Sequence, residues 1–139
     1  MKILCIDIGN TNLNYAIVEK MEVSDANSFP TKRLKDDLHY IKEFHTLIEK
    51  HSVSAVSFCS VVPDLDSRLR SLLDLEIPIY QLTNQTLKGI DLHYPKPDEV
   101  GHDRIANALT AQEYFSLPAV IIDLGTAITL DVVSEKGYE

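Results

Sequence analysis

Apolar runs and amphipathic stretches alternate along this chain, and the alternation predicts an α/β protein. Short, mostly apolar runs are typical of buried strands, and apolar residues at helical spacing indicate helices. The predicted strands span residues 2–8, 13–18, 22–29, 53–62 and 77–82, with a further hairpin over 119–133. The predicted helices span about 33–50, 64–73 and 102–115, and the stretch 83–100 is expected to be a loop.

The order of these elements predicts one sheet with helices packed on it, followed by the start of a second sheet. The last two strands repeat the hairpin that opens the chain, yet a complete repeat would need roughly another hundred residues. We therefore expect a first domain over residues 1–117 and the first hairpin of an incomplete second domain over residues 118–139. In that arrangement the apolar residues of the second hairpin lack packing partners, so we expect the isolated chain to self-associate.

Both predicted hairpins carry an Asp-x-Gly sequence at the turn. Residues 7–11 are Asp-Ile-Gly-Asn-Thr, and residues 123–129 are Asp-Leu-Gly-Thr-Ala-Ile-Thr. Either sequence alone is typical of an ordinary turn, in which glycine permits the reversal. An acidic residue at the end of a buried strand is costly without a cation or donor partner, and its repetition favours a site for metal-bound phosphates. Two such turns indicate a duplicated fold that holds a nucleotide between its halves.

A third candidate sequence, Gly101-His102-Asp103-Arg104, lies at the start of a predicted helix. Taken alone, it suits an ordinary helix start, with Asp103 near the positive end of the helix dipole and Arg104 in solvent. The alternative is that Asp103 accepts a proton from a substrate hydroxyl while Arg104 binds an anionic group. The residues alone favour the first interpretation, in which His102 is incidental. Tyr94, in a stiff Tyr-Pro-Lys-Pro loop, is either a pocket wall or a packing residue.

Composition narrows the class of protein. The 139 residues carry 13 basic and 21 acidic side chains, a net charge of −8, which argues against a nucleic-acid surface. The apolar content of 45% is too evenly interrupted for a membrane span, and Lys2 is followed by a strand rather than by a secretory leader. We therefore expect a cytoplasmic protein. The 2 cysteines, Cys5 and Cys59, lie in strand-like apolar runs and are expected to be buried, reduced thiols.

Taken together, these sequences resemble the type III pantothenate kinase family. The resemblance rests on residues 7–11, Ser-Val-Val-Pro at residues 60–63, Tyr94 seven residues before the Gly101–Arg104 sequence, and residues 123–129. It implies the duplicated ribonuclease H-like fold of the actin-like ATPases, which acetate and sugar kinases, Hsp70 and actin share. It also implies a homodimer that uses ATP to phosphorylate pantothenate to 4′-phosphopantothenate, the first step of coenzyme A biosynthesis.

The same resemblance assigns roles to individual residues. The ATP phosphates would be bound by Asp7, Ile8, Gly9, Asn10, Thr11, Asn12, Leu13 and Asn14, with Thr126 also contacting ATP. Pantothenate would be bound by Tyr94, Gly101, His102, Asp103 and Arg104, with Asp103 as the proton acceptor. Asp123 would hold a monovalent cation, K⁺ or NH₄⁺, and Mg²⁺ would accompany ATP. The expected partners are thus pantothenate, ATP and a second copy of the chain, without nucleic acid or membrane.

Two features depart from the family pattern. Many members have lysine where this chain has Asn14, and the chain stops at Glu139 where the family continues with a glycine-rich strand and a substrate-contacting threonine. Three alternatives stay open: another kinase or ATPase of the same fold, a non-catalytic regulator, and a fragment that folds without activity. Tyr94 together with residues 101–104 argues against the first, and the acidic charge gives no support for a regulator that contacts DNA.

Overall fold

The computed structural model describes residues 1–36, 39–73, 76–125 and 127–139, and it divides into two compact units, Met1–Gln81 and Leu82–Glu139. Each unit has its own sheet and its own apolar core. The boundary predicted between residues 117 and 118 falls inside the second unit, because the helix before it packs on the strands after it. The two units reflect contacts within this chain, whereas the predicted domains are the halves of a duplicated fold. The predicted domain division therefore stays a prediction.

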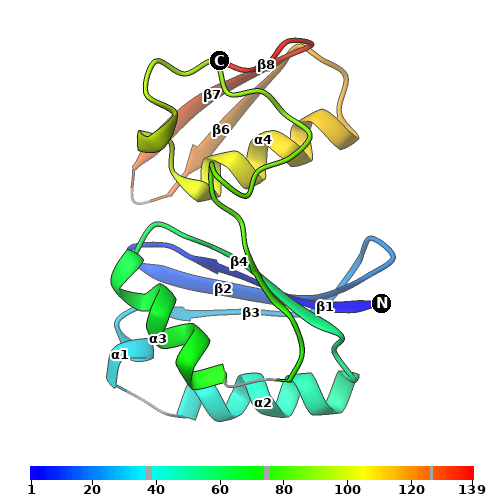
Figure 1. Ribbon diagram of the computed structural model, residues 1–139, viewed down its shortest axis with the longest axis vertical. Helices are drawn as coiled ribbons and strands as arrows, with labels where there is room; N and C mark the ends of the chain where they lie inside the picture. The colour runs from blue at the N-terminus through cyan, green and yellow to red at the C-terminus, as the bar shows by residue number, and fades with distance from the viewer. Residues whose placement is uncertain (37–38, 74–75, 126) are drawn as a thin grey trace. The chain divides into compact units, whose positions relative to one another are not determined.

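A five-stranded mixed sheet forms the first unit, called unit 1 (Figure 1). Its strands are β1 (Lys2–Ile8), β2 (Asn12–Glu19), β3 (Glu22–Pro30), β4 (Ala55–Ser60) and β5 (Ile79–Gln81). Their order in the sheet is β3-β2-β1-β4-β5. The first three strands are antiparallel neighbours, whereas β4 runs parallel to both β1 and β5. All five correspond to predicted strands, although β4 and β5 are shorter than the predicted runs.

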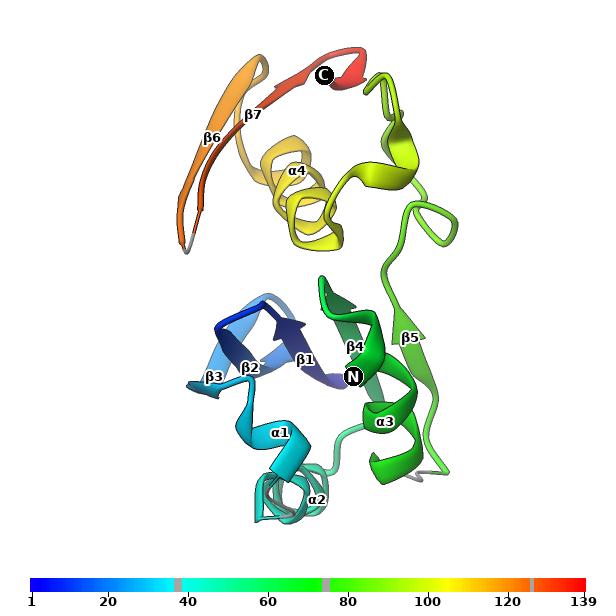
Figure 2. The ribbon, with the colours of Figure 1, turned by 90° about the vertical axis from the view of Figure 1, so that its left-hand side faces the viewer.

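Three helices, α1 (Arg33–Asp36), α2 (His39–His51) and α3 (Pro63–Leu73), cover one face of this sheet (Figure 2). Because side chains alternate along a strand, Leu4, Ile6 and Ile8 of β1 share the face toward the helices, and each is at most 3% exposed. Helical residues such as Phe44 complete the same core. Asp7 of β1 therefore lies on the opposite face of the sheet, away from the helices.

The second unit, called unit 2, is a three-stranded antiparallel sheet with one long helix against it (Figure 2). Its elements are η1 (Pro97–Glu99), α4 (His102–Tyr114), β6 (Ala119–Leu124), β7 (Ile128–Ser134) and β8 (Gly137–Tyr138). The helix and the β6–β7 hairpin confirm predicted elements, whereas β8 was not predicted. Gly137 has a φ of 132°, and a Cβ there would lie 2.3 Å from the carbonyl oxygen of Asp91, so the position requires glycine.

The two faces of the β6–β7 hairpin differ in burial. The face toward α4 includes Asp131 and Val133, which are at most 1% exposed. The other face, called the outward face, exposes a row of apolar side chains: Val120, Ile122, Leu124, Ile128, Leu130 and Val132. The prediction that this hairpin lacks packing partners is therefore confirmed for the outward face. It is wrong for Ile121 and Val133, which pack in the core of unit 2.

Candidate functional site

The turn between β1 and β2 is closed and supported by hydrogen bonds. The N–H of Gly9 donates to the carbonyl of Asn12 at 3.0 Å. A Cβ on Gly9 would lie 2.9 Å from that same oxygen, so a larger residue requires the turn to shift. Thr31 supports the turn from the end of β3: its hydroxyl donates to the carbonyl of Gly9 at 2.7 Å, and its N–H donates to the carbonyl of Thr11 at 2.8 Å. The turn thus has a defined backbone shape.

The predicted ATP-binding residues of this turn divide into two kinds. The side chains of Ile8 and Leu13 are fully buried, so these residues face a ligand only through their backbone. The side chains of Asn10, Thr11 and Asn12 are exposed at the tip of the hairpin. An exposed turn with backbone N–H groups and short polar side chains can donate hydrogen bonds to phosphate oxygens. The structure therefore presents the polar atoms that phosphate binding requires.

Asp7 is held between its neighbours on both sides of β1. It pairs with Asn14 on β2 and with Cys59 on β4. The Nδ2 of Asn14 donates to one carboxylate oxygen at 3.1 Å, and the Cys59 thiol lies 3.5 Å from the other. Both cysteines are thiols, as predicted, but Cys5 is only partly buried. Burial raises the pKa of the Cys5 thiol.

The β6–β7 turn has a similar design. The N–H of Gly125 donates to the carbonyl of Ala127 at 3.1 Å. Asp123 pairs with Thr129 on the neighbouring strand. The hydroxyl oxygen of Thr129 is buried without a hydrogen-bond partner in the part of the chain that the structure describes. Thr126, the predicted ATP contact, lies outside the described residues.

These residues fit the predicted cation only in part. Within the described ranges, no group of three or more His, Cys, Asp or Glu side chains could hold a metal ion. Asp123 and Thr129 do place a carboxylate and an unpaired hydroxyl side by side across the hairpin, and oxygen is the ligand that hard cations prefer. A cation at this place would need carbonyl or water ligands as well.

Asp103 lies in the first turn of α4 and uses one carboxylate oxygen to bond the helix backbone. Its Oδ1 accepts a hydrogen bond from the backbone N–H of Arg104 at 2.8 Å. Its other oxygen has no partner among the residues described. Gly101 is the N-cap residue and makes no side-chain hydrogen bond to the helix. The positive end of the helix dipole lies at this N-terminus, close to Asp103. Asp103 therefore serves the helix start and still has an oxygen for a ligand.

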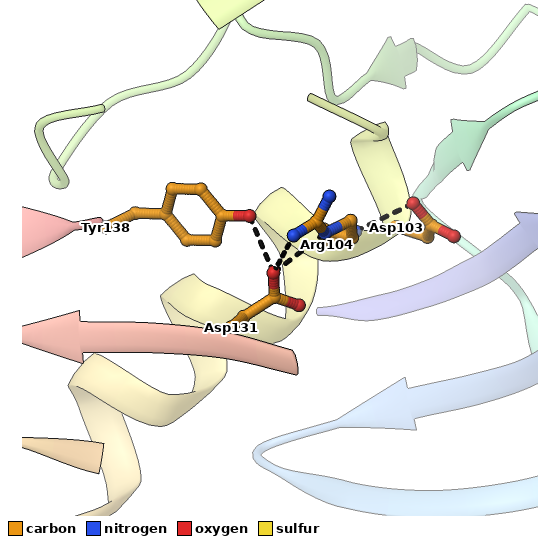
Figure 3. Close-up of polar contacts among 4 residues, drawn as sticks. All are labelled: Asp103, Arg104, Asp131 and Tyr138. Atoms are coloured by element: carbon orange, nitrogen blue, oxygen red, sulfur yellow. Dashed lines mark hydrogen bonds and ion pairs between the residues drawn. The ribbon is translucent and has the colours of Figure 1, made fainter. Parts of the chain in front are cut away.

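Arg104 is bound to a buried acid, Asp131 of β7 (Figure 3). Its Nε donates to Oδ1 of Asp131 at 2.7 Å, and its Nη2 donates to the same oxygen. The phenol of Tyr138 donates to that oxygen too, at 2.6 Å. The hydrogen bond with Asp131 raises the pKa of Arg104, while burial and the Asp131 bond raise that of Tyr138. The expectation that Arg104 lies in solvent is wrong, because Asp131 holds it.

Tyr138 also connects Arg104 to Tyr94. The Cζ atom of Arg104 lies 5.9 Å from the centre of the Tyr138 ring, within reach of a cation–π interaction. The rings of Tyr138 and Tyr94 are 6.4 Å apart and tilted by 53°. The structure thus gathers Tyr94 and Arg104, two predicted pantothenate contacts, in unit 2. His102 begins the same helix, and its Nδ1 is buried without a partner in the described part of the chain.

Asp131, Tyr138 and Thr31 support the site and were not predicted from the sequence. The sequence could have indicated Asp131, because an acid inside the apolar run Leu130–Val133 needs a partner when it is buried. Thr31 follows a proline before a predicted helix, and nothing in that position indicates a contact with the β1–β2 turn. The predicted ATP residues 7–14 belong to unit 1, and the predicted pantothenate and cation residues belong to unit 2.

Known proteins resemble this chain in sequence. The profile of the type III pantothenate kinase family matches residues 3–139. Type III pantothenate kinases from Persephonella marina and Myxococcus xanthus are each 34% identical to it, over 99% and 97% of the chain. One from Frankia alni is 31% identical over 97% of the chain. The chain spans about half the length of these curated relatives, since the matches cover 57%, 56% and 55% of theirs.

Solved structures share its fold. The type II variant of the Ppx/GppA phosphatase from Aquifex aeolicus has a TM-score of 0.59 at 15% identity, and the match covers 100% of this chain and 49% of that one. A ROK family glucokinase from Streptomyces griseus has a TM-score of 0.54 at 14% identity, covering 100% and 46%. These likenesses confirm the actin-like ATPase fold and no more. The family profile and the sequence relatives show that the chain belongs to the type III pantothenate kinase family.

Proposed function

We propose that this chain carries the ATP-phosphate turn and the pantothenate-binding helix start of a kinase that converts pantothenate to 4′-phosphopantothenate. Membership of the family supports the reaction. The observation that carries the proposal is the cluster in unit 2, where Tyr94 and Arg104 both approach Tyr138 and Asp103 lies beside Arg104. These are the residues that the family resemblance assigns to pantothenate.

The chemistry of unit 2 suits the substrate. Phosphoryl transfer depends mainly on positioning and on neutralisation of charge, so groups that fix the acceptor matter most. Asp103 would accept the proton of the primary hydroxyl through the carboxylate oxygen that the Arg104 amide leaves available. Arg104 would bind the carboxylate of pantothenate, aided by the positive end of the α4 dipole.

The two Asp-x-Gly turns would serve ATP and its ions. The exposed tip of the β1–β2 hairpin would bind the phosphates, with its shape held by Thr31 and its carboxylate, Asp7, held by Asn14. Mg²⁺ would accompany ATP and neutralise charge on its phosphate oxygens. K⁺ or NH₄⁺ would bind at Asp123, where the hydroxyl of Thr129, left without a hydrogen-bond partner by the described residues, would be a second oxygen ligand. Thr126 would contact ATP.

The proposal extends to a cytoplasmic homodimer whose small-molecule partners are pantothenate and ATP. The net charge of −8 disfavours nucleic acid as a partner. No helix in the described part of the chain is long and apolar enough to cross a bilayer. Sedimentation of the chain at several concentrations would test the dimer, and a monomer at every concentration would contradict it.

A coupled assay of ADP release tests the reaction, using this chain and a version extended to the length of its curated relatives. Pantothenate-dependent ADP release is expected from the extended version, and glucose in place of pantothenate should release none. Asp103→Asn is expected to lower kcat by about 10²–10⁴-fold with little change in the KM for ATP. Glu113→Gln, an exposed acid on the same helix, is the matched control. Wild-type turnover by Asp103→Asn would exclude Asp103 as the base, and no response to pantothenate would favour another kinase of this fold or a regulator.

A further inference from the structure

The contacts of Arg104 determine which part of its guanidinium is available to a ligand. Nε and Nη2 both donate to Asp131, so these two nitrogens are occupied. Nη1 has no hydrogen-bond partner among the described residues and points away from Asp131 (Figure 3). The side chain of Arg104 is 25% exposed, whereas that of Asp131 is 0% exposed. A ligand can therefore reach the arginine through Nη1 but cannot reach the acid that holds it.

Three elements of unit 2 meet at a single oxygen of Asp131. Arg104 comes from α4, Asp131 from β7 and Tyr138 from β8. The ring of Tyr138 lies beside the guanidinium and its hydroxyl bonds the same carboxylate, so it restrains both members of the pair. The position of Arg104 thus depends on the packing of the whole unit and not only on its own helix.

This pair of a buried acid and a partly exposed arginine is better at fixing geometry than at stabilising the fold. Taking charged groups out of water costs free energy that offsets much of their attraction. A solvent-exposed arginine samples many rotamers and loses that freedom when it binds a ligand. Arg104 has already lost that freedom in the folded unit, so binding a ligand orders it little further. A cationic group held in this way is preorganised for an anion.

We propose that Asp131 and Tyr138 are positioning residues that hold the guanidinium of Arg104 so that Nη1 faces the carboxylate of bound pantothenate. The inference rests on the proposed function, which supplies that carboxylate. Neither Asp131 nor Tyr138 touches the substrate, and each acts through Arg104. Their loss therefore weakens the binding of pantothenate and leaves the phosphoryl-transfer step nearly unchanged.

Steady-state kinetics of the extended version test the positioning role. Asp131→Asn keeps an oxygen in place and removes the charge, and Tyr138→Phe removes only the phenol hydrogen bond. The KM for pantothenate should rise about tenfold in Asp131→Asn and about threefold in Tyr138→Phe, with kcat within about twofold of the wild type. Glu135→Gln removes the same charge from the exposed β7–β8 turn and should leave KM unchanged.

A double mutant separates positioning from general stability. If Asp131 acts through Arg104, then Asp131→Asn should raise KM no further in an Arg104→Ala background. A full rise in that background, or a loss of kcat at constant KM, would overturn the proposal. Should Asp131→Asn fail to fold, Tyr138→Phe decides, because it keeps the ring that packs in the core, and an unchanged KM in that variant would overturn the role of Tyr138.

A second measurement needs no activity and uses the 139-residue chain itself. An arginine Nε–H held by a buried carboxylate exchanges slowly with water, and NMR resolves its signal. Exchange at Arg104 should be about tenfold or more faster in Asp131→Ala than in the wild type and in Glu135→Gln. Equal exchange rates would show that Asp131 does not hold Arg104. If the wild-type extended version released no ADP in response to pantothenate, the proposed function would be overturned instead. The exchange rates at Arg104 would still show whether Asp131 holds it.

Discussion

Asp7 and Asp123 occupy the same place in two hairpins, each opposite a polar residue of the neighbouring strand. Asp7 pairs with Asn14, and Asp123 pairs with Thr129. In both hairpins the glycine two residues after the acid donates its N–H to a carbonyl across the turn, at 3.0 and 3.1 Å. The repeated sequence thus places the acid at the same point before each turn, although the turn between β1 and β2 is one residue longer than the turn between β6 and β7.

The two turn glycines should nevertheless differ in their tolerance of alanine. A Cβ at Gly9 would lie 2.9 Å from a backbone oxygen, whereas one at Gly125 would meet atoms no closer than 3.6 Å. We expect Gly9→Ala to lower the free energy of unfolding by about 1–3 kcal/mol, because the backbone of the turn must shift. Gly125→Ala, the matched control, should stay within about 0.5 kcal/mol of the wild type. Urea unfolding measures both, and equal losses would contradict the argument.

Asp123→Ala should make kinase activity both lower and insensitive to potassium. The reason is that the carboxylate lies beside the hydroxyl of Thr129, which has no hydrogen-bond partner among the described residues. Thr129→Val should therefore weaken the potassium response too. Activity of the extended version is titrated against potassium and sodium chloride at constant ionic strength, with Glu113→Gln as the control. A potassium response that survives in Asp123→Ala would place the cation elsewhere.

Stability should fall at high pH because two buried tyrosines resist ionisation. Burial, with a contribution from Glu43, raises the pKa of Tyr15 to about 12, and burial raises the pKa of Tyr138 as well. Tyrosines of the unfolded chain ionise near pH ~10, so the unfolded state loses protons first. The stabilisation is therefore complete below about pH 10 and is lost as the pH rises through the folded-state pKa values. Unfolding free energies across this range should fall less steeply in Tyr15→Phe, and identical slopes would refute the assignment.

The outward face of the β6–β7 hairpin should drive self-association of the 139-residue chain. Ile122 and Leu130 are cross-strand partners on this face and are 61% and 64% exposed. The double variant Ile122→Glu with Leu130→Lys places opposite charges across the strands, and it should lower the average mass measured by light scattering. Val23→Lys is the control, since Val23 is equally exposed but lies on β3 of unit 1, outside the outward face. A wild-type chain that stays monomeric would contradict the prediction.

The sequence predicts the hairpins well because their signals are local. Alternating apolar residues decide which face of β1 is buried, and the glycine after each acid determines where the chain reverses. Once the hairpins are given, pairing Asp7 with Asn14 follows from counting residues on either side of the turn. The alternation of strands and helices likewise favours the observed α/β class.

The residues that hold Arg104 in place could not be predicted from local patterns. Its partner Asp131 is 27 residues away on another element, and no local pattern indicates which buried acid an arginine will meet. The sequence alone favoured an exposed Arg104 at an ordinary helix start, because that outcome requires no partner. The strand β8 was missed for a similar reason, since Gly137 and Tyr138 are too few to show a period. The structure leaves Thr126 outside its described residues, so its role stays a prediction.

The mixed sheet of unit 1 has a consequence for the order of folding. The β1–β2 hairpin joins residues close in sequence, but the pairing of Asp7 with Cys59 closes a loop between residues 52 positions apart. Closing a longer loop costs more chain entropy, and this cost is incurred before the contacts between its ends stabilise the fold. We expect amides of the β1–β2 hairpin to gain protection before those of β4 in pulse-labelled refolding, and simultaneous protection would argue otherwise. A newly made chain would then have its β1–β2 turn before Cys59 reaches the carboxylate of Asp7.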